Sequence, residues 1–167
     1  MTARSSRLVV AAAVVDSLTR PTAMLCAARS YPAEHAGQYE LPGGKVEPDE
    51  TPTRALIREL AEELDLAVIL GGEVHPPRNL AVAAPPPGAA HRAQDFPDDD
   101  APAWPVLHGY RMRVWLAEPA LPDSRPQAGG AHESVRWVAW EELDSLPWLP
   151  ADLPILAAIR DTATTAS

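Results

Sequence analysis

Three glutamates at helical spacing, Glu59, Glu62 and Glu63, are the side chains of this sequence best suited to hold a cation. Residues three and four apart share one face of a helix, so the three carboxylates project toward one region. A ligand set made only of oxygens favours Mg²⁺ or Mn²⁺ over zinc. The stretch 47–65 holds seven acidic residues against two basic ones, and such like charges oppose folding unless a cation binds among them.

Basic and glycine residues lie beside these acids. Arg58 comes one residue before Glu59 and four before Glu62, so it can orient a carboxylate through a bidentate hydrogen bond. Lys45 follows Gly44 in a glycine turn, where the backbone can approach a metal or phosphate closely and a carbonyl can serve as a further ligand. With a bound cation, such a site can bind a phosphate chain and stabilise charge as a P–O bond breaks, and a carboxylate left off the metal can take a proton from water. The pattern predicts metal-assisted hydrolysis of a phosphoanhydride; the alternative is a solvated glutamate-rich helix face.

The run GKVEPDETPTRALIRELAEELDL, residues 44–66, resembles the Nudix box. That motif is a glycine, five residues, Glu, seven residues, Arg-Glu-aliphatic, one residue, Glu-Glu, one residue and Gly-aliphatic. The matching residues are Gly44, Glu50, Arg58, Glu59, Leu60, Glu62, Glu63 and Leu66. Only the late glycine differs, being Asp65. That glycine would end the helix in a left-handed conformation, which Asp adopts at a cost of about 1 kcal/mol, so we expect a slightly weaker cap and intact chemistry.

The resemblance implies an α/β fold, the Nudix α/β/α sandwich with a mixed β-sheet. It implies dependence on Mg²⁺ (or Mn²⁺) and attack of water on a nucleoside diphosphate linked to another group. By position, the metal ligands would be Glu59, Glu62, Glu63 and the carbonyl of Gly44. Arg58 would orient Glu59, and Glu50 would support the charge network of the site.

The flanking stretches QYELPGGKVEPDE and WLPADLPIL resemble the MutT and CTP pyrophosphohydrolase branch, which cleaves nucleoside triphosphates to monophosphate and pyrophosphate. The resemblance implies that Asp152 reads the base; a carboxylate there suits cytosine, a 5-substituted cytosine or an oxidised guanine. The alternative is a helix N-cap. Arg29 is similar to the arginine that contacts the triphosphate, although a plain surface role is as compatible. Tyr39 packs either against a base or in the core.

One departure concerns a fourth carboxylate, a metal ligand or base that relatives often place six residues before a tryptophan like Trp137. Here that position holds Ala131. Either Glu133 substitutes for it, or a glutamate of the helix is the general base. His132, next to it, is expected to have a structural or supporting role.

The remaining sequence must supply the elements that position these residues. We predict strands at 7–15, 22–29, 38–41, 67–74, 106–118 and 134–139, and helices beginning at 51, 140 and 151. The first two strands are expected to form a hairpin. In the helix from 51, an apolar sector of Leu56, Ile57, Leu60 and Leu64 should pack on the sheet while the glutamates face a cleft.

The chain is expected to be one domain, 1–167, with a Pro-rich insertion at about 75–105. This segment carries eight prolines and a triple-Asp run, so it should not form a regular core element, and we expect it to be mobile at least over 85–100. It is either a solvated loop without a function or a lid over the substrate. The first six residues should form a loose terminus.

Composition excludes several classes of function. The net charge of −9 disfavours nucleic-acid polymers and anionic membranes as partners. The single cysteine, Cys26, permits no internal disulfide and is expected to be inert core, which fits a cytoplasmic location. The apolar run VVAAAVV is too short to span a bilayer and lacks a following cleavage site.

Together these features predict a Mg²⁺-dependent hydrolase that converts a (d)NTP and water to (d)NMP and pyrophosphate. Its substrates would be oxidised or excess nucleotides of the 8-oxo-dGTP or CTP/dCTP type, and the protein would be a monomer or homodimer. The alternatives are hydrolysis of another nucleoside diphosphate derivative, such as ADP-ribose or a dinucleoside polyphosphate, and a non-catalytic nucleotide-binding domain. The intact Arg-Glu and Glu-Glu pairs argue against the last.

Overall fold

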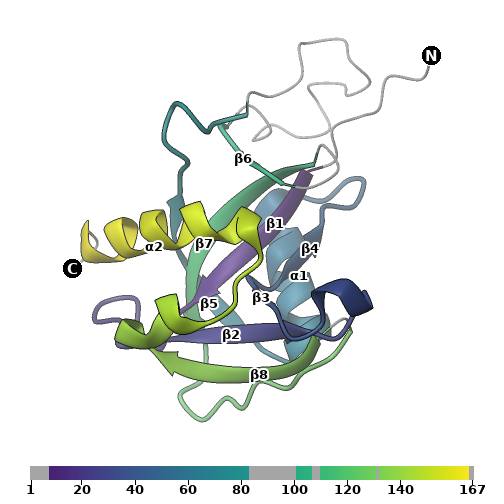
Figure 1. Ribbon diagram of the computed structural model, residues 1–167, viewed down its shortest axis with the longest axis vertical. Coiled ribbons are helices and arrows are strands. Elements are labelled where there is room, and N and C mark those ends of the chain that lie inside the picture. The colour runs from purple at the N-terminus through teal and green to yellow at the C-terminus, as the bar shows by residue number, and fades with distance from the viewer. Residues whose placement is uncertain (1–7, 83–100, 107–109, 131, 166–167) are drawn as a thin grey trace.

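A computed structural model describes residues 8–82, 101–106, 110–130 and 132–165, and its centre is a pair of β-sheets flanked by helices (Figure 1). One sheet has the order β4-β1-β7-β5, with β6 also paired to β7, and the other has the order β3-β2-β8. The strands are β1 Leu8–Val14, β2 Ala23–Arg29, β3 Tyr39–Glu40, β4 Gly43–Lys45, β5 Val68–Val74, β6 Trp104–Pro105, β7 Arg111–Pro119 and β8 His132–Ala139. The helices are α1 Pro52–Leu64 and α2 Leu153–Thr165, with 3-10 turns η1 Ala33–His35, η3 Trp140–Ser145 and η4 Pro150–Asp152.

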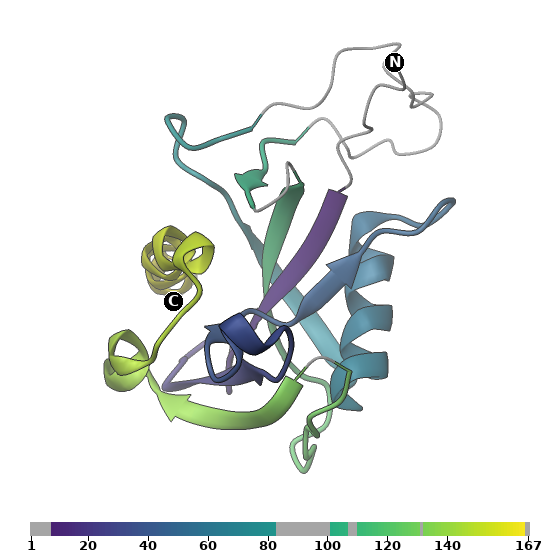
Figure 2. The same ribbon diagram turned by 45° about the vertical axis from the view of Figure 1, so that its right-hand side comes forward.

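Strand β1 lies between two hydrophobic cores. Val10, Ala12 and Val14 pack with α1, whereas the alternate residues Ala11 and Ala13 pack in the core that contains α2. Successive side chains of a strand point to opposite faces, so the sheet must lie between the two helices. Figure 2 shows α1 and α2 on opposite sides of it. Because β1 pairs in parallel with β7 and antiparallel with β4, the sheet is mixed, and the predicted α/β/α sandwich is confirmed.

Helix α1 begins and ends as its sequence predicts. The hydroxyl oxygen of Thr51 accepts a hydrogen bond from the Arg54 N–H, and Asp65 adopts the left-handed conformation at φ 51°. The Asp65 N–H donates to the carbonyl oxygen of Ala61 at 3.1 Å, which satisfies a carbonyl left free at the end of the helix. Three of the predicted apolar residues are fully buried, but Ile57 is 44% exposed, so its inclusion in the buried sector was wrong.

The predicted hairpin between the first two strands is wrong. β1 and β2 belong to different sheets, and the chain between them is joined by the isolated bridge Val15–Met24 and by a hydrogen bond from the Asp16 N–H to the carbonyl of Ala23. β1 is buried on both faces and its two edges are taken by β4 and β7. The chain after Asp16 therefore crosses to the second sheet, where β2 pairs with β3 and β8.

The predicted glycine turn at 43–44 is instead strand β4. Gly43 pairs with Ala11 and Gly44 with Val10, and neither glycine has a positive φ. These residues are glycine because of close contacts: a Cβ on Gly43 would collide with the backbone of Val10 and Ala11. Lys45 accordingly lies on a strand and not on a turn.

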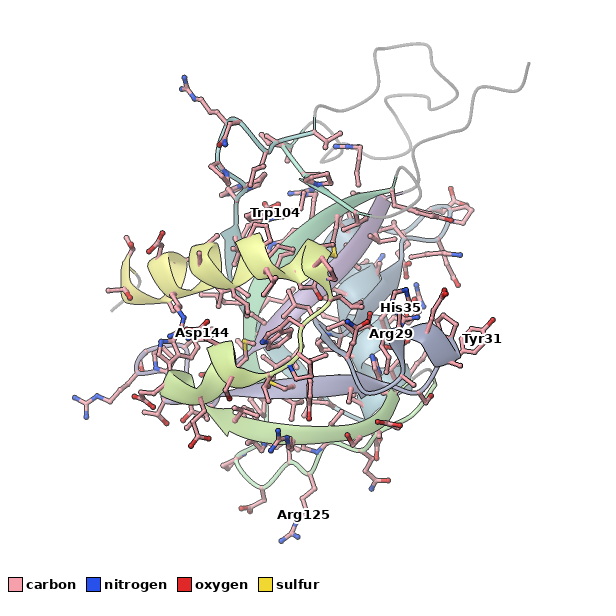
Figure 3. All side chains as sticks on the ribbon, viewed as in Figure 1. Arg29, Tyr31, His35, Trp104, Arg125 and Asp144 are labelled. Atoms are coloured by element: carbon pink, nitrogen blue, oxygen red, sulfur yellow. The ribbon has the colours of Figure 1, made fainter. Side chains whose placement is uncertain are left out.

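The end of the Pro-rich segment enters the core, contrary to prediction. Trp104 is 2% exposed, forms β6 with Pro105, and its indole N–H donates to the carbonyl of Val74 at 2.9 Å (Figure 3). Val82 and Ala103 form a bridge that joins the two ends of this segment. An indole can enter a core in a short Pro-bounded strand because its N–H finds an acceptor there. The predicted mobility of 85–100, like that of the first six residues, lies outside the described residues.

Other boundaries shift by smaller amounts. The predicted strand 106–118 begins as a strand of the first sheet only at Arg111, and the helix predicted at 140–146 is a 3-10 turn. β8 starts at His132, two residues earlier than expected. Cys26 is fully buried, and burial raises the pKa of its thiol to about 12, as expected of inert core. Within the described ranges, no helix is long and apolar enough to cross a membrane.

Candidate active site

Arg58 connects the acidic residues of the predicted motif. Its guanidinium donates two hydrogen bonds of 2.8 Å to the carboxylate of Glu50, in the bidentate geometry that arginine favours. The same side chain donates to Glu59 at 3.0 Å, to Glu62 at 3.3 Å and to the backbone carbonyl of Lys45 at 3.1 Å. The hydrogen bonds from Arg58 hold the pKa of Glu50 below its usual value. The structure thus brings together Glu50, Arg58, Glu59 and Glu62, as the sequence predicts.

Glu59 lies directly against strand β4. A Cβ built on Gly44 would collide with the Glu59 carboxylate, and the Glu59 side chain is only 14% exposed. Gly44 is therefore required for Glu59 to reach the backbone of β4. Gly44 and the carboxylate of Glu59 are consequently close neighbours, and their shared ligand role stays a prediction.

Of the three glutamates, Glu63 is the one with a buried oxygen, Oε2, that lacks a hydrogen-bond partner among the described residues. Burial raises the pKa of this carboxyl to about 7, with nearby His132 opposing the rise and the Glu59 carboxylate adding to it. A buried carboxylate oxygen without a partner is unfavourable unless a proton or a cation satisfies it.

These residues fit a divalent cation chemically, although they are not gathered as a finished ligand set. Over the ranges that the structure describes, no three acidic, histidine or cysteine side chains converge closely enough to hold a metal ion. Glu59 and Glu62 both accept from Nη1 of Arg58, which keeps their carboxylates turned toward the guanidinium. A hard cation nonetheless prefers carboxylate oxygens as ligands, and one of these oxygens, Oε2 of Glu63, is buried without a partner among the described residues.

A second set of charged groups continues from Glu63 into the β3-β2-β8 sheet. The Glu40 carboxylate accepts from Nη1 of Arg29 at 2.6 Å and from Nε2 of His132 at 2.9 Å. Nδ1 of His132 lies 3.8 Å from Oε2 of Glu63. Arg29 also donates from Nε to the carbonyl of Tyr31 (Figure 3). Arg29 is thus a partly buried side chain held by two neighbours, and its contact with a triphosphate stays a prediction.

Asp152 lies on the same side of the molecule as Glu40. Its carboxylate is 6% exposed and accepts from the backbone N–H of Leu41, the residue that follows Glu40, at 3.2 Å. Burial raises the pKa of Asp152 to about 7, partly opposed by the Leu41 hydrogen bond. The hydrogen bond described for this carboxylate runs to the segment after β3 and not to the start of α2, so the N-cap interpretation finds no support.

Tyr39 is half-buried and packed on two sides. Its ring lies 6.0 Å from that of Trp148, and Arg136 donates to its hydroxyl at 3.1 Å. These contacts support the interpretation as packing, and a contact with a base stays a prediction.

The side chains of two predicted site residues stand apart from the acidic helix, although the backbone carbonyl of one of them, Lys45, accepts from Arg58. Lys45 is exposed, and its ammonium lies 5.8 Å from the ring centroid of Tyr110. Glu133 is exposed on β8, and within the described residues it makes no hydrogen bond or ion pair with the glutamates of α1. It is the extra residue of a bulge, because Ser134 pairs with Ala28 and His132 pairs with Arg29. The bulge buries His132 and leaves Glu133 in solvent.

Sequence reasoning missed Glu40. No spacing within the chain connects Glu40 to Arg29 or His132, because their contacts depend on the pairing of three strands. The available signal was a carboxylate between apolar residues at the end of a short strand, since buried acids need partners.

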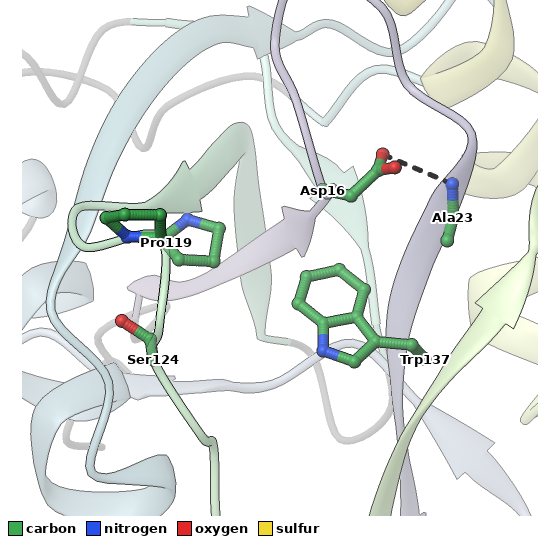
Figure 4. Close-up of a pocket in the computed structure, with 6 residues that line it drawn as sticks. Asp16, Ala23, Pro119, Ser124 and Trp137 are labelled. Carbon is green, nitrogen blue, oxygen red and sulfur yellow. Dashed lines mark hydrogen bonds between the residues drawn. The ribbon is translucent and has the colours of Figure 1, made fainter.

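A hollow of about 310 Å³ lies elsewhere, lined by Asp16, Ala23, Pro119, Pro122, Ser124 and Trp137 (Figure 4). The Asp16 carboxylate is already occupied by Thr22 and the Ala23 N–H. Gly44 pairs with Val10, six residues before Asp16, so the hollow is roughly 20 Å away along β1. It is separate from the acidic site. Trp137, 39% exposed, lines this hollow.

Comparison with known proteins decides the family. The family model described as the NUDIX domain matches residues 6–159. The chain belongs to the Nudix family. Members of this family generally need a divalent metal, and the chain is a Nudix hydrolase of phosphoanhydrides.

This Nudix chain is similar to the following two relatives and one solved structure. A Mycobacterium tuberculosis (strain H37Rv) protein with the provisional name 8-oxo-dGTP diphosphatase 2 is 35% identical over 159 residues, covering 94% of this chain and 90% of that one. The CTP pyrophosphohydrolase of Escherichia coli K12 is 30% identical over 150 residues, covering 89% and 88%. The solution structure of the E. coli ORF135 protein superposes with a TM-score of 0.63 at 27% identity, covering 95% and 91%. The MutT-like resemblance expected from the sequence is therefore confirmed.

Proposed function

We propose that this Nudix hydrolase is a nucleoside triphosphate pyrophosphohydrolase, which converts a (d)NTP and water to (d)NMP and pyrophosphate. The observation that carries the proposal is the arrangement around Arg58, which holds Glu50, Glu59 and Glu62 next to the unpartnered oxygen of Glu63. Similarity to an 8-oxo-dGTP diphosphatase and a CTP pyrophosphohydrolase supports a triphosphate substrate with a modified or pyrimidine base.

We propose Mg²⁺, or Mn²⁺, as the cofactor. Glu59, Glu62, Glu63 and the Gly44 carbonyl would hold it, since Glu59 and Gly44 are in contact and Glu63 has an unsatisfied oxygen. When bound, the cation supplies charge neutralisation for the phosphates and activation of water. The chain carries the matching acidic surface, which without a cation would repel a triphosphate.

The residues of the chain have separable tasks in this proposal. Arg58 keeps Glu59 and Glu50 in place through three hydrogen bonds from a guanidinium that stays charged at neutral pH. Arg29, anchored on Glu40, would bind the triphosphate, and Lys45 would contribute positive charge from the adjacent strand. We assign the general base to a glutamate of α1, because Glu133 is exposed on β8 with no described contact to that helix.

Asp152 would read the base. It lies buried beside the segment after β3, and a carboxyl with a pKa of about 7 offers an acceptor pair when ionised and a donor with an acceptor when protonated. The ionised form suits the N–H groups of an oxidised guanine, and the protonated form suits the amine and ring nitrogen of cytosine. The role of Tyr39 beside a base, the single domain over 1–167 with its Pro-rich insertion, the cytoplasmic location and the monomeric or dimeric state remain predictions.

The test is a substrate panel with product identification. The purified chain is incubated with Mg²⁺ or Mn²⁺ and with dGTP, 8-oxo-dGTP, CTP, dCTP, ADP-ribose or a dinucleoside polyphosphate. Pyrophosphate and a nucleoside monophosphate from a triphosphate are expected, and Glu59→Gln and Glu63→Gln should each lower the rate by orders of magnitude. Glu141→Gln, at an exposed acid outside the site, is the matched control. Full activity in either site variant, or exclusive cleavage of ADP-ribose or the dinucleoside polyphosphate, would refute the proposal.

A further inference from the structure

Glu40 binds two nitrogen-bearing side chains at once, and they come from different strands. Its Oε2 accepts from Arg29 on β2 and its Oε1 accepts from His132 on β8, at 2.6 Å and 2.9 Å. The Glu40 side chain is 17% exposed and that of His132 is 3% exposed. Burial opposes ionisation of Glu40, but the hydrogen bonds from His132 and Arg29 hold its pKa below the usual value. Glu40 is therefore a carboxylate with both oxygens engaged.

An ionised carboxylate only accepts hydrogen bonds, so the nitrogen of His132 that faces Glu40 must carry a proton. That nitrogen is Nε2. In a neutral ring the other nitrogen, Nδ1, is then an acceptor. Nδ1 faces Oε2 of Glu63 at 3.8 Å, and neither atom has a hydrogen-bond partner in the described part of the chain. The ring thus connects Glu40 on one side to a candidate metal ligand on the other.

We propose that Glu40 is a positioning residue of the active site, which fixes the Nε2–H tautomer and orientation of His132 so that Nδ1 faces Glu63. The same carboxylate also holds Arg29. Glu40 would thus align both His132, which faces Glu63, and Arg29, which would bind the phosphates. Residues that orient a metal ligand typically change activity 10- to 100-fold when removed, and Glu40 would act on Glu63 through His132. The kinetic part of this inference depends on the proposed function, whereas the tautomer does not.

The tautomer is measured by NMR on the full chain labelled with ¹⁵N-histidine, at about pH 8 and without metal or nucleotide. Long-range proton–nitrogen spectra distinguish the two tautomers, and the His132→Asn spectrum assigns the ring. Wild-type His132 should show a protonated Nε2, and Glu40→Ala should replace this pattern by a mixture. Glu34→Gln is the matched control, because Glu34 is an exposed acid 3.9 Å from His35. A protonated Nδ1 with bare Nε2 in the wild type, or an unchanged His132 in Glu40→Ala, overturns the proposal.

Kinetic coupling supplies the second arm. Glu40→Gln and His132→Gln should each lower kcat about 10- to 100-fold, and the double variant should be no slower than the worse single variant. Multiplied losses in the double variant would show that Glu40 does not act through His132. If Glu40→Ala does not fold, as judged by circular dichroism, the same NMR comparison with Glu40→Gln decides. If the wild type cleaves no nucleoside triphosphate, the proposed function fails, while the NMR result still decides the tautomer.

Discussion

Arg58 and Glu50 are joined by two parallel hydrogen bonds of 2.8 Å across eight residues of sequence. The pair ties the loop before α1 to the middle of the helix, and from there Nη1 of Arg58 reaches the Glu59 carboxylate. An ammonium group cannot reproduce the planar fork that makes these contacts simultaneous.

Arg58→Lys should therefore lower kcat/KM by roughly tenfold or more, because Glu59 and Glu50 lose their shared donor. Steady-state pyrophosphate release checks this. Arg54→Lys, on the same helix and exposed, should leave the rate near that of the wild type. Equal rates for Arg58→Lys and the wild type would show that the fork is not needed.

Gly44→Ala should displace the Glu59 carboxylate, because the added Cβ takes the space of that group. We expect at least a roughly tenfold weaker affinity for Mn²⁺, measured by titration calorimetry with the wild type in parallel. Gly72→Ala is the matched control, since a Cβ at Gly72 meets nothing within 4 Å. Unchanged Mn²⁺ affinity in Gly44→Ala would mean that Glu59 is not a ligand.

Asp65→Gly should stabilise the protein by about 1 kcal/mol, raising Tm by roughly 2–4 °C, because glycine adopts the left-handed conformation without a Cβ penalty. Removing a negative charge from the end of the helix adds to this gain. Asp65→Ala should instead lower Tm, since alanine tolerates that conformation poorly. Thermal unfolding measures both, and a lower Tm for the glycine variant would contradict the cap interpretation.

Asp152→Asn should change stability in a pH-dependent way. The folded pKa of about 7 lies above the usual 3.8, so the folded state binds the proton more tightly than the unfolded chain does. Below about pH 4 the carboxyl therefore does not lower the free energy of unfolding. The loss of stability grows as the pH rises to 7 and is fully present above it. The charge of Glu40 increases this loss of stability, and the charge of Arg29 reduces it.

The variant should consequently match the wild type in Tm near pH 4 and exceed it by several degrees near pH 8. Paired melting curves at the two pH values measure this. A difference in Tm that is the same at both values would show that Asp152 does not titrate between them.

Local chemistry made α1 and its acids predictable from the sequence. Thr51, the glutamate spacing and Asp65 act within a few residues of one another, so the start, the end and the face of the helix follow from near neighbours. The sandwich followed from the family resemblance. The partners of Glu40 were not predictable, since Arg29 and His132 meet it only through strand pairing.

Two errors had the same physical origin. The assumed hairpin of β1 and β2 and the assumed turn at Gly43 were both local interpretations of segments whose partners are distant. β1 pairs with β7, about a hundred residues later, and no residue near β1 in the sequence indicates that β7 is its partner strand. Ile57 was placed in the buried sector because helical periodicity predicts which face of a helix is apolar. It does not predict how much of that face the neighbouring elements cover.

The bridge between Val82 and Ala103 places the two ends of the stretch 83–102 side by side, with backbone hydrogen bonds of 2.8 Å and 3.2 Å. Because the two ends are held together, lengthening the connection between them costs little additional conformational entropy. Trimming residues 84–100 to a tight connection should thus leave the fold standing, provided that Trp104 still reaches Val74. A change in the length of this connection is therefore expected to leave the hydrogen bonds of Arg58 to Glu50 and Glu59 in place.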